Sequence, residues 1–327
     1  MKGVCALFSQ TDVSCNHTRK PTKMNFYKYT SFDTTKLIIQ NKTIRWSSPL
    51  KFNDIEECQF VPYSKESFEK ANREYFDILI KIANGENLDI DYHRLSEITK
   101  MLISIIRLSI DQNTFDATNI IDNVINFASN PEADYREYIN KGLIRVFRIL
   151  CVTAKFDNKL MWAHYGDQHY GCVIELSKLY IDKPRGLKEG RVDYHENLYP
   201  KTNSLDLLLY GETPELRDLM IQDVIFSKRS IWNYEEEFRL MYSENFGNIQ
   251  FVHNFQTNEK SLTASNQTDE LFTDVPIEMD YIKSITFGVR VTEESIQQMI
   301  EHLKSHDINC NLYKMILNDS SLERISL

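Results

Sequence analysis

The stretch of chain that most constrains the fold is the alternating segment at residues 232–240. If it is a strand, successive side chains point to opposite faces, so its apolar residues share one face and its charged residues the other. The apolar face would carry Trp232, Tyr234, Phe238 and Leu240, and the charged face Glu235, Glu237 and Arg239. Carboxylates two residues apart on a strand lie about 7 Å from each other, and each raises the pKa of the other unless a cation or ligand lies between them. The segment predicts the wall of a polar cleft, although an exposed strand with a solvated Glu237–Arg239 pair would show the same pattern.

The three tryptophans lie in separate segments that are rich in aromatic and polar residues. Trp46 is followed by Ser47, Ser48, Asn53 and Asp54. Trp162 is followed by His164 and Tyr165, and Trp232 by the glutamates. Large amphipathic rings beside hydrogen-bonding groups favour one shared pocket. Three independent core anchors are the alternative.

Composition limits the class of protein. The 327 residues are enough for one large domain or two small ones, and 42% hydrophobic with 26% charged residues is typical of a globular chain. A net charge of −9 does not indicate nucleic-acid binding. The apolar runs are too short to cross a membrane, and the first residues lack a secretory signal. Six scattered cysteines without a C-x-x-C pair disfavour zinc ligation and a disulfide framework, and indicate reduced thiols in a cytoplasm.

The order of patterns predicts an α+β fold. Residues 1–23 are a polar extension without periodicity, and residues 24–327 form a single domain. It opens with a strand, a short helix and a second strand over residues 27–47. Apolar residues at helical spacing then predict a helical insertion at about 64–142, including a helix at 101–110 that is buried on more than one side and another at about 120–127. Afterwards strands and helices alternate, with a helix at 159–168 and helix starts at Thr213-Pro214-Glu215 and at Thr292.

Several common sites are excluded by their motifs. There is no G-x-G-x-x-G for a dinucleotide fold and no G-x-S-x-G for a nucleophile elbow. Gly166 and Gly171 have the spacing of a phosphate loop, but Cys172 and Val173 replace its Lys and Ser/Thr. His164 and His169 are five residues apart, which is not metal-ligand spacing, so no metal is expected. The remaining residues suit a nucleoside: aromatic rings stack on a base, Ser, Asn and Asp bind ribose, and a carboxylate stabilises an oxocarbenium-like centre.

A family resemblance rests on motifs spread over residues 26–327. In order they are Tyr27-Lys28-Tyr29-Thr30-Ser31, Ser47-Ser48-Pro49 with Phe52-Asn53-Asp54, Met161-Trp162-Ala163-His164-Tyr165 with His169 and Gly171, Lys228 with Trp232-x-Tyr234-Glu235-x-Glu237-Phe238-Arg239, and residues 282–288 before a helix. The chain thereby resembles the bacterial family called domain of unknown function 2971. The departure is Ile55-Glu56-Glu57, where the family usually has Pro-Phe-Glu.

The opening unit and the Glu-x-Glu segment are also similar to the ADP-ribosyltransferase superfamily, which implies a split sheet and NAD as substrate. The resemblance gives an NAD-contacting role to Lys28 or Tyr29 on the first strand, and to Ser47 or Ser48 on the second. It makes Glu237 the catalytic acid and Glu235 the group that orients the nucleophile. The first strand lacks the His or Arg of the better-known classes.

Together these observations predict an ADP-ribosyltransferase-like enzyme that cleaves the nicotinamide–ribose bond of NAD and acts as a toxin or a phage-defence effector. Its catalytic residues would be Glu237, Glu235 and His164. Its NAD-binding residues would be Lys28, Tyr29, Trp46, Ser47, Ser48, Asn53, Asp54, Trp162, Tyr165 and Arg239. The alternatives are a binding module for a nucleotide without catalysis, and a hydrolase that uses the glutamates with His164. The expected partner is a small-molecule nucleotide, and the sequence does not identify a macromolecular acceptor.

Overall fold

The computed structural model describes residues 25–54, 56–58, 65–112, 144–196, 202–244, 249–254, 259–264, 270–319 and 321–327, with the backbone alone at 249–254 and 259–264. The predicted extension at 1–23 and the predicted helix at about 120–127 lie outside these residues. The strands are β1 (Phe26–Thr30), β2 (Thr43–Ser47), β3 (Phe147–Thr153), β4 (Cys172–Leu176), β5 (Lys188–Arg191), β6 (Asp193–His195), β7 (Ser227–Arg229), β8 (Glu237–Ser243), β9 (Ile249–Asn254), β10 (Glu259–Ala264), β11 (Phe272–Pro276), β12 (Ile282–Phe287), β13 (Asn311–Asn318) and β14 (Ser321–Ser326). The helices are α1 (Phe32–Asn41), α2 (Lys65–Ala83), α3 (Glu97–Asp111), α6 (Ile144–Val146), α7 (Lys159–His164), α8 (Ser204–Tyr210), α9 (Pro214–Ile225) and α10 (Glu293–Ser305). Short 3₁₀ helices are η1 (Pro49–Lys51), η2 (Tyr92–Arg94), η4 (Asp167–His169), η5 (Ser230–Glu235) and η6 (Met279–Tyr281).

Ten of the described strands form one mixed sheet with the order β11-β2-β3-β1-β4-β12-β13-β14, and β8 and β5 extend it from β3. β8 pairs with β3 along its whole length, while the other edge of β3 is shared between β2, at Ile149, and β1, at Thr153. The sheet therefore forks at β3. Only β12 and β13 run parallel within the described part of this sheet. The α+β prediction with a mixed sheet is confirmed.

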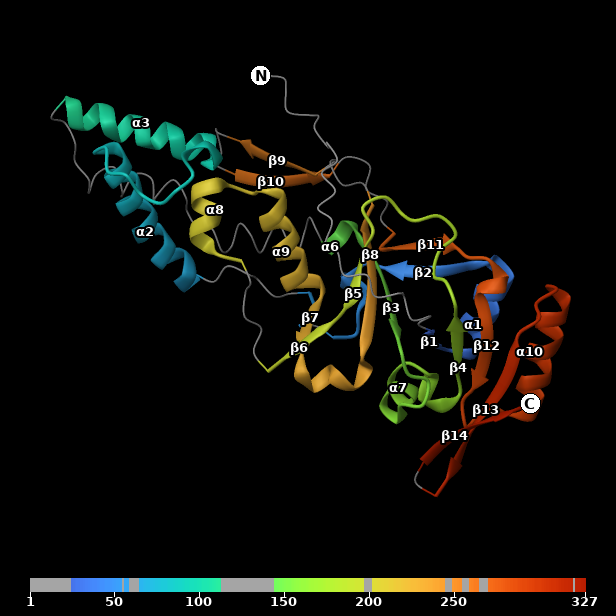
Figure 1. The fold of residues 1–327 in the computed structure, drawn as a ribbon. Coiled ribbons are helices and arrows are strands. Elements are labelled where there is room, and N and C mark those ends of the chain that lie inside the picture. The colour runs from blue at the N-terminus through green and yellow to red at the C-terminus, as the bar shows by residue number, and fades with distance from the viewer. Residues whose placement is uncertain are drawn as a thin grey trace.

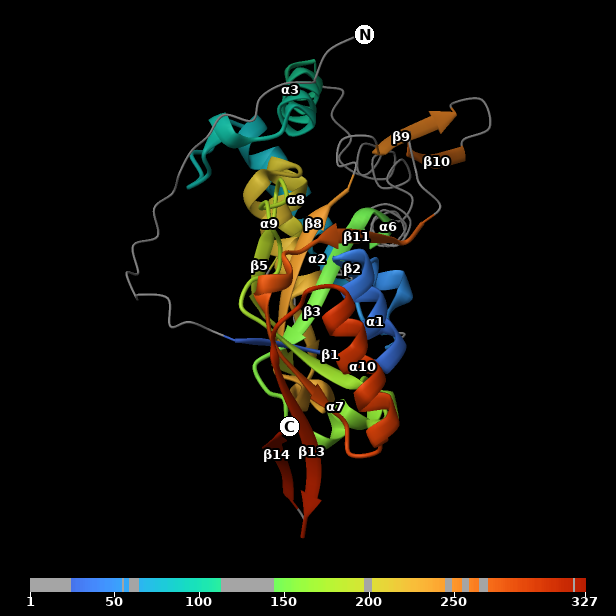
Figure 2. The same cartoon turned by 90° about the vertical axis from the view of Figure 1, so that its right-hand side faces the viewer.

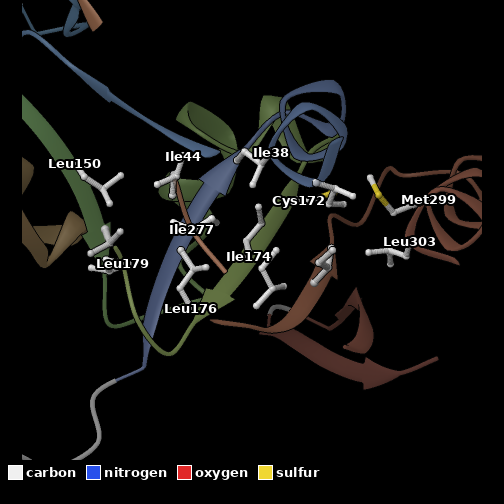
Figure 3. Close-up of a cluster of buried hydrophobic side chains, with 14 of the residues drawn as sticks. Ile38, Ile44, Leu150, Cys172, Ile174, Leu176, Leu179, Ile277, Met299 and Leu303 are labelled. Carbon is white, nitrogen blue, oxygen red and sulfur yellow. The ribbon is translucent and has the colours of Figure 1, made fainter. Parts of the chain in front are cut away.

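The main core lies between the sheet and the helices α1 and α10 (Figures 1 and 2). Ile38 and Ile39 of α1 and Met299 and Leu303 of α10 pack on Ile174 and its neighbours in the sheet, as Figure 3 shows for many of them. Both predicted helix starts in the second half of the chain are confirmed. The Thr213 hydroxyl accepts from the backbone N–H of Leu216 with Pro214 at the first helical position, and Thr292 caps α10.

A separate lobe of α2, α3 and α8 lies at one end of the molecule, opposite the hairpin of β13 and β14 (Figures 1 and 2). Its apolar core comprises Tyr75, Phe76, Leu79, Ala83, Leu95, Ile103, Ile106 and Leu209. One predicted feature is wrong: α3 is not buried on more than one side, because Ile98, Met101 and Ile105 are exposed. Only the face with Thr99, Ile103 and Ile106 packs against α2 and α8.

The predicted helix at 159–168 ends early, at His164, because a left-handed turn follows it. Asp167, Gln168 and His169 have φ angles of 50°, 52° and 71°, a region that costs non-glycine residues about 1–2 kcal/mol each. Gly288 permits the close packing that holds this turn, since a Cβ there would lie 2.1 Å from the carbonyl oxygen of His169. The turn depends on a residue more than a hundred positions away, so the local pattern could not indicate it.

The buried core of the helical lobe predicts how shortening one of its side chains changes stability. Leu79 is fully buried between the helices, so Leu79→Ala should lower the free energy of unfolding by about 2–5 kcal/mol. The matched control is Ile98→Ala on the exposed face of α3, 67% exposed, which should change it by less than about 0.5 kcal/mol. Denaturant unfolding of both variants measures the difference, and equal losses would show that the lobe does not pack in this way.

Candidate functional site

A cluster of five charged side chains lies buried where β7, η5, β8 and the turn at 56–58 meet. These residues, called the charge cluster below, are Glu57, Lys228, Glu235, Glu237 and Arg239, and none is more than 8% exposed. Charged side chains are almost never this deeply buried unless they are paired. Three carboxylates and two cations therefore have to satisfy one another here.

Lys228 is the centre of the charge cluster. Its Nζ lies 2.6 Å from Glu235 Oε2, 3.3 Å from Glu57 Oε2 and 3.4 Å from Glu237 Oε1. The indole of Trp232 lies over the same ammonium, with 4.9 Å between Nζ and the ring centroid. The spacing of Glu235 and Glu237 implied that each would raise the pKa of the other unless a cation or ligand lay between them. Lys228 is that cation.

Arg239 holds the deep side of the charge cluster. Its Nε donates to Glu237 Oε2 at 2.7 Å, one terminal nitrogen donates to the carbonyl of Ile225 at 2.5 Å, and the other pairs with Glu57. The residue is fully buried and lies opposite Cys151 of β3. The planar guanidinium, with its five N–H donors, suits such a multiple contact.

The local fold explains why Glu236 is left out of the charge cluster. Residues 230–235 form the 3₁₀ helix η5, and Glu236 ends it in the left-handed region with a φ of 44°. β8 begins only at the next residue, and the side chain of Glu236 pairs with Lys155. The prediction of one continuous strand over 232–240 is therefore wrong in its first half.

The prediction that the charged face is solvent-facing is also wrong. Glu235, Glu237 and Arg239 are buried, while Trp232, Tyr234 and Phe238 are only half-buried. A period of two indicates which side chains share a face but not which face lies inward. Both faces of β8 are covered: Leu240 lies in the main core on one side, and on the other Lys228 compensates the glutamates while Glu57 pairs with Arg239.

The composition of the charge cluster raises the affinity of Glu237 for a proton. Three carboxylates face two cations, so full ionisation would leave one uncompensated negative charge in a buried site. Burial raises the pKa of Glu237 to about 8; Lys228 opposes this shift and the neighbouring Glu235 adds to it. Burial alone would lower the pKa of Lys228, but Glu237 and Glu235 raise it above its usual range. The charge cluster thus retains one proton at neutral pH and balances its charges.

Aromatic and polar side chains connect the charge cluster to the surface; they are called the rim below and comprise Asn53, His164, Tyr165, Trp232 and Tyr234. The Tyr165 hydroxyl donates to Glu235 Oε1 at 2.7 Å and accepts from the Asn53 amide at 3.3 Å. His164 Nδ1 lies 2.9 Å from the Tyr234 hydroxyl, and its ring contacts Trp232 edge-to-face. Asn53 and His164 are exposed and the other three are half-buried. The rim offers rings and hydrogen-bonding groups directly above a buried carboxylate.

The three tryptophan-containing segments meet here, although two of the tryptophans do not take part. Asn53, Tyr165 and Glu235 come one from each segment and form a chain of hydrogen bonds. Trp46 is fully buried in the main core, where it packs against Tyr242, and Trp162 is fully buried between Tyr29 and His169. Those two are core anchors, which was the alternative interpretation.

The other predicted site residues have contacts of their own. The Ser48 hydroxyl donates to the carbonyl of Ile144 and is fully buried, and Ser47 pairs with Phe272 in the sheet. Lys28 donates to the carbonyl of Cys151, and Asp54 accepts from the backbone of Glu56. None of these four has a hydrogen bond to the rim or the charge cluster among the described contacts.

Two residues of the charge cluster were not predicted as site residues. Lys228 and Glu57 appeared only in the family motifs, because neither is adjacent in sequence to the Glu-x-Glu segment. The available signal was the charge count: a buried glutamate pair and one arginine require a further cation. Tyr194 was also missed; its hydroxyl accepts from the backbone N–H of Glu237 at 3.0 Å.

Two further properties of the described residues concern the site and its surroundings. They contain no group of three or more His, Cys, Asp or Glu side chains placed to hold a metal ion. No helix among them has the length and apolar character needed to span a membrane.

Comparison with known proteins gives a family match that covers most of the site. Residues 161–240 match the model of a family described as protein of unknown function (DUF2971). The matched stretch contains α7 from Met161 onward, the whole of β7 and η5, and the charged residues of β8, while Asn53 and Glu57 lie outside it. No curated protein and no solved structure matches the chain.

The raised pKa of Glu237 predicts how stability depends on pH. Between the ordinary value of 4.5 and about 8, the native state holds a proton that the unfolded state has lost. Stability should therefore fall as pH rises through this range, by up to about 1.4 kcal/mol per pH unit. In Glu237→Gln, an uncharged amide replaces the protonated carboxyl and this slope should be absent. Denaturant unfolding of both proteins from pH 5 to 8.5 measures the slope. The same dependence of the free energy of unfolding on pH in both proteins would contradict a proton held on Glu237 in the native state.

Two arginine–glutamate pairs, whose glutamates are neighbours in the turn at 56–58, allow the stability effect of a buried ion pair to be compared with that of an exposed one. Arg239→Met would leave Lys228 as the one cation of the charge cluster facing three carboxylates, and should cost about 3–5 kcal/mol. Arg229→Met removes the partner of Glu56 at 2.9 Å, where both side chains are about half exposed, and should cost less than about 1 kcal/mol. Similar losses in the two variants would mean that the charge cluster is open to water.

Proposed function

We propose that this chain, which belongs to the DUF2971 family through residues 161–240, is an ADP-ribosyltransferase-like enzyme that cleaves the nicotinamide–ribose bond of NAD. The observation that carries the proposal is the hydrogen-bonded chain from Asn53 through Tyr165 to Glu235. It sets a carboxylate beneath half-buried rings on which the bases of a nucleotide can stack. A toxin or defence role would follow from loss of cellular NAD or from modification of an acceptor.

Glu235 has the better position for facing the ligand. Its Oε1 is bonded to Tyr165 of the rim, whereas both oxygens of Glu237 are held by Lys228 and Arg239. In breaking the bond between ribose C1′ and nicotinamide, the electron pair goes to the nicotinamide nitrogen and positive charge develops on the ribose. The net negative charge of the ionised cluster would stabilise that charge. The resemblance to transferases had given the main role to Glu237, and we assign Glu237 to the support of Glu235.

One observation favours the second candidate, a binding module without catalysis. Lys228 and Arg239 neutralise most of the carboxylate charge, and a neutralised carboxylate gives less stabilisation to an oxocarbenium-like centre. The rim would then bind a nucleotide without turnover. The third candidate, a hydrolase using His164, lacks support because His164 is bonded to Tyr234 and not to a carboxylate of the charge cluster.

Three consecutive glutamates give a matched test. With NAD as the only substrate, wild-type protein should release nicotinamide, which chromatography measures. Glu235→Gln and Glu237→Gln should each lower turnover by about 10²–10³-fold. Glu236→Gln should retain it, because that side chain pairs with Lys155 outside the charge cluster.

The pattern of losses separates the candidates. NAD binding without nicotinamide release supports the binding module, and absence of both removes NAD from consideration. Equal turnover in all three variants would remove the charge cluster from the chemistry. A larger loss in Glu237→Gln than in Glu235→Gln would return the main role to Glu237.

A further inference from the structure

Tyr165 is the connection between the buried carboxylates and the surface. In the part of the chain that the structure describes, it is the one side chain outside the charge cluster that donates a hydrogen bond to a cluster carboxylate. Its hydroxyl also accepts from Asn53, which is exposed. The remaining carboxylate bonds come from Lys228 and Arg239 within the charge cluster. A proton that moves between the charge cluster and a ligand on the rim has this hydroxyl on its path.

The charge cluster can hold and lose one proton, because its three carboxyl groups have only two cationic partners. The groups that face Glu235 and Glu237 from the surrounding elements are Lys228 of β7, Arg239 of β8, Glu57 and Cys58 of the turn, Cys151 of β3, Tyr194 of β6, and Tyr165 and Tyr234 of the rim. Burial and Glu235 both raise the pKa of Tyr165, so the tyrosine stays protonated and acts as the donor. Burial raises the pKa of both cysteines, so these thiols stay neutral.

We infer that Tyr165 relays protons from the acceptor group of the bound substrate to the charge cluster. The inference rests on the proposed function and adds to it the path of the acceptor's proton. The acceptor is then a group with an O–H bond, either water or a hydroxyl. The relay works in the ionised cluster, which carries one uncompensated negative charge.

The step balances in atoms and electrons. The bond between ribose C1′ and the nicotinamide nitrogen breaks, and nicotinamide leaves as a neutral molecule with the electron pair. The acceptor oxygen forms a bond to C1′ and passes its proton to Tyr165 Oη. The original hydroxyl proton of Tyr165 moves to Glu235 Oε1, 2.7 Å away in the resting structure. The charge cluster ends neutral and returns the proton to solvent through the same hydroxyl.

Infrared spectroscopy tests the coupling of Tyr165 to the charge cluster without any substrate. Protein labelled with ¹³C-glutamate should show a protonated carboxyl band at pH 7 that disappears with a midpoint near 8, and Glu237→Gln assigns it. Tyr165→Phe removes the donor to Glu235, so the negative charge on Glu235 acts more strongly on Glu237 and should raise the midpoint by about one pH unit. Tyr170→Phe removes the hydroxyl of an exposed tyrosine on the following turn and should leave it unchanged. An unchanged midpoint in Tyr165→Phe overturns the inference.

Turnover tests the relay itself. The rate of nicotinamide release at saturating NAD should rise with pH in wild type and in Tyr170→Phe, with the midpoint that infrared gives. Tyr165→Phe should lose about 10²-fold and the pH dependence with it, at a matched thermal midpoint of unfolding. A wild-type pH profile in Tyr165→Phe overturns the relay and leaves the proposed function intact. Absence of release by wild type at every pH overturns both.

Discussion

The ammonium of Lys228, held among three carboxylates, is the interaction on which this part of the molecule depends. It joins the consecutive elements β7, η5 and β8 to the turn at 56–58, which lies far earlier in the sequence. An ion removed from water costs several kcal/mol in a real protein interior, so each of these segments is stable in its place only while the others supply its partners. The charge cluster thereby fixes how the turn after η1 packs against the end of the sheet.

The apolar shell around the charge cluster determines its chemistry. Val224 and Ile225 of α9, Ile149 of β3 and Met241 of β8 belong to one buried apolar group on this face of the sheet. The same group contains Cys58, the residue after Glu57. Since water is excluded, Coulomb interactions among the five charges are stronger than at the surface. An excess charge is correspondingly unfavourable, and a carboxyl group with an ordinary pKa in water then holds its proton at neutral pH.

Sequence patterns predicted the parts of the fold that depend on local chemistry. The caps at Thr213 and Thr292 needed only a hydroxyl, a following acid and an apolar stripe, all within one turn of helix. The meeting of the Asn53, Tyr165 and Glu235 segments was indicated by their shared composition. The burial of Arg239 was not predictable in the same way, because its partner Glu57 lies about 180 residues earlier. The early end of α7 likewise depends on packing against Gly288.

The unequal charge count argues that the charge cluster has more than a structural role. Two cations need two carboxylates, and a pair of ion pairs, or a set of apolar side chains of the same volume, would be at least as stable in a buried position. The third carboxylate adds a desolvated group that must take up a proton to be accommodated. Glu237, with a pKa near 8, lies beside Glu235, and Glu235 accepts a hydrogen bond from the half-buried Tyr165; a proton-holding carboxyl group linked in this way to the rim is the arrangement that proton-transferring sites need. Stability alone gives no reason for the third carboxylate, whereas proton transfer to the rim requires it.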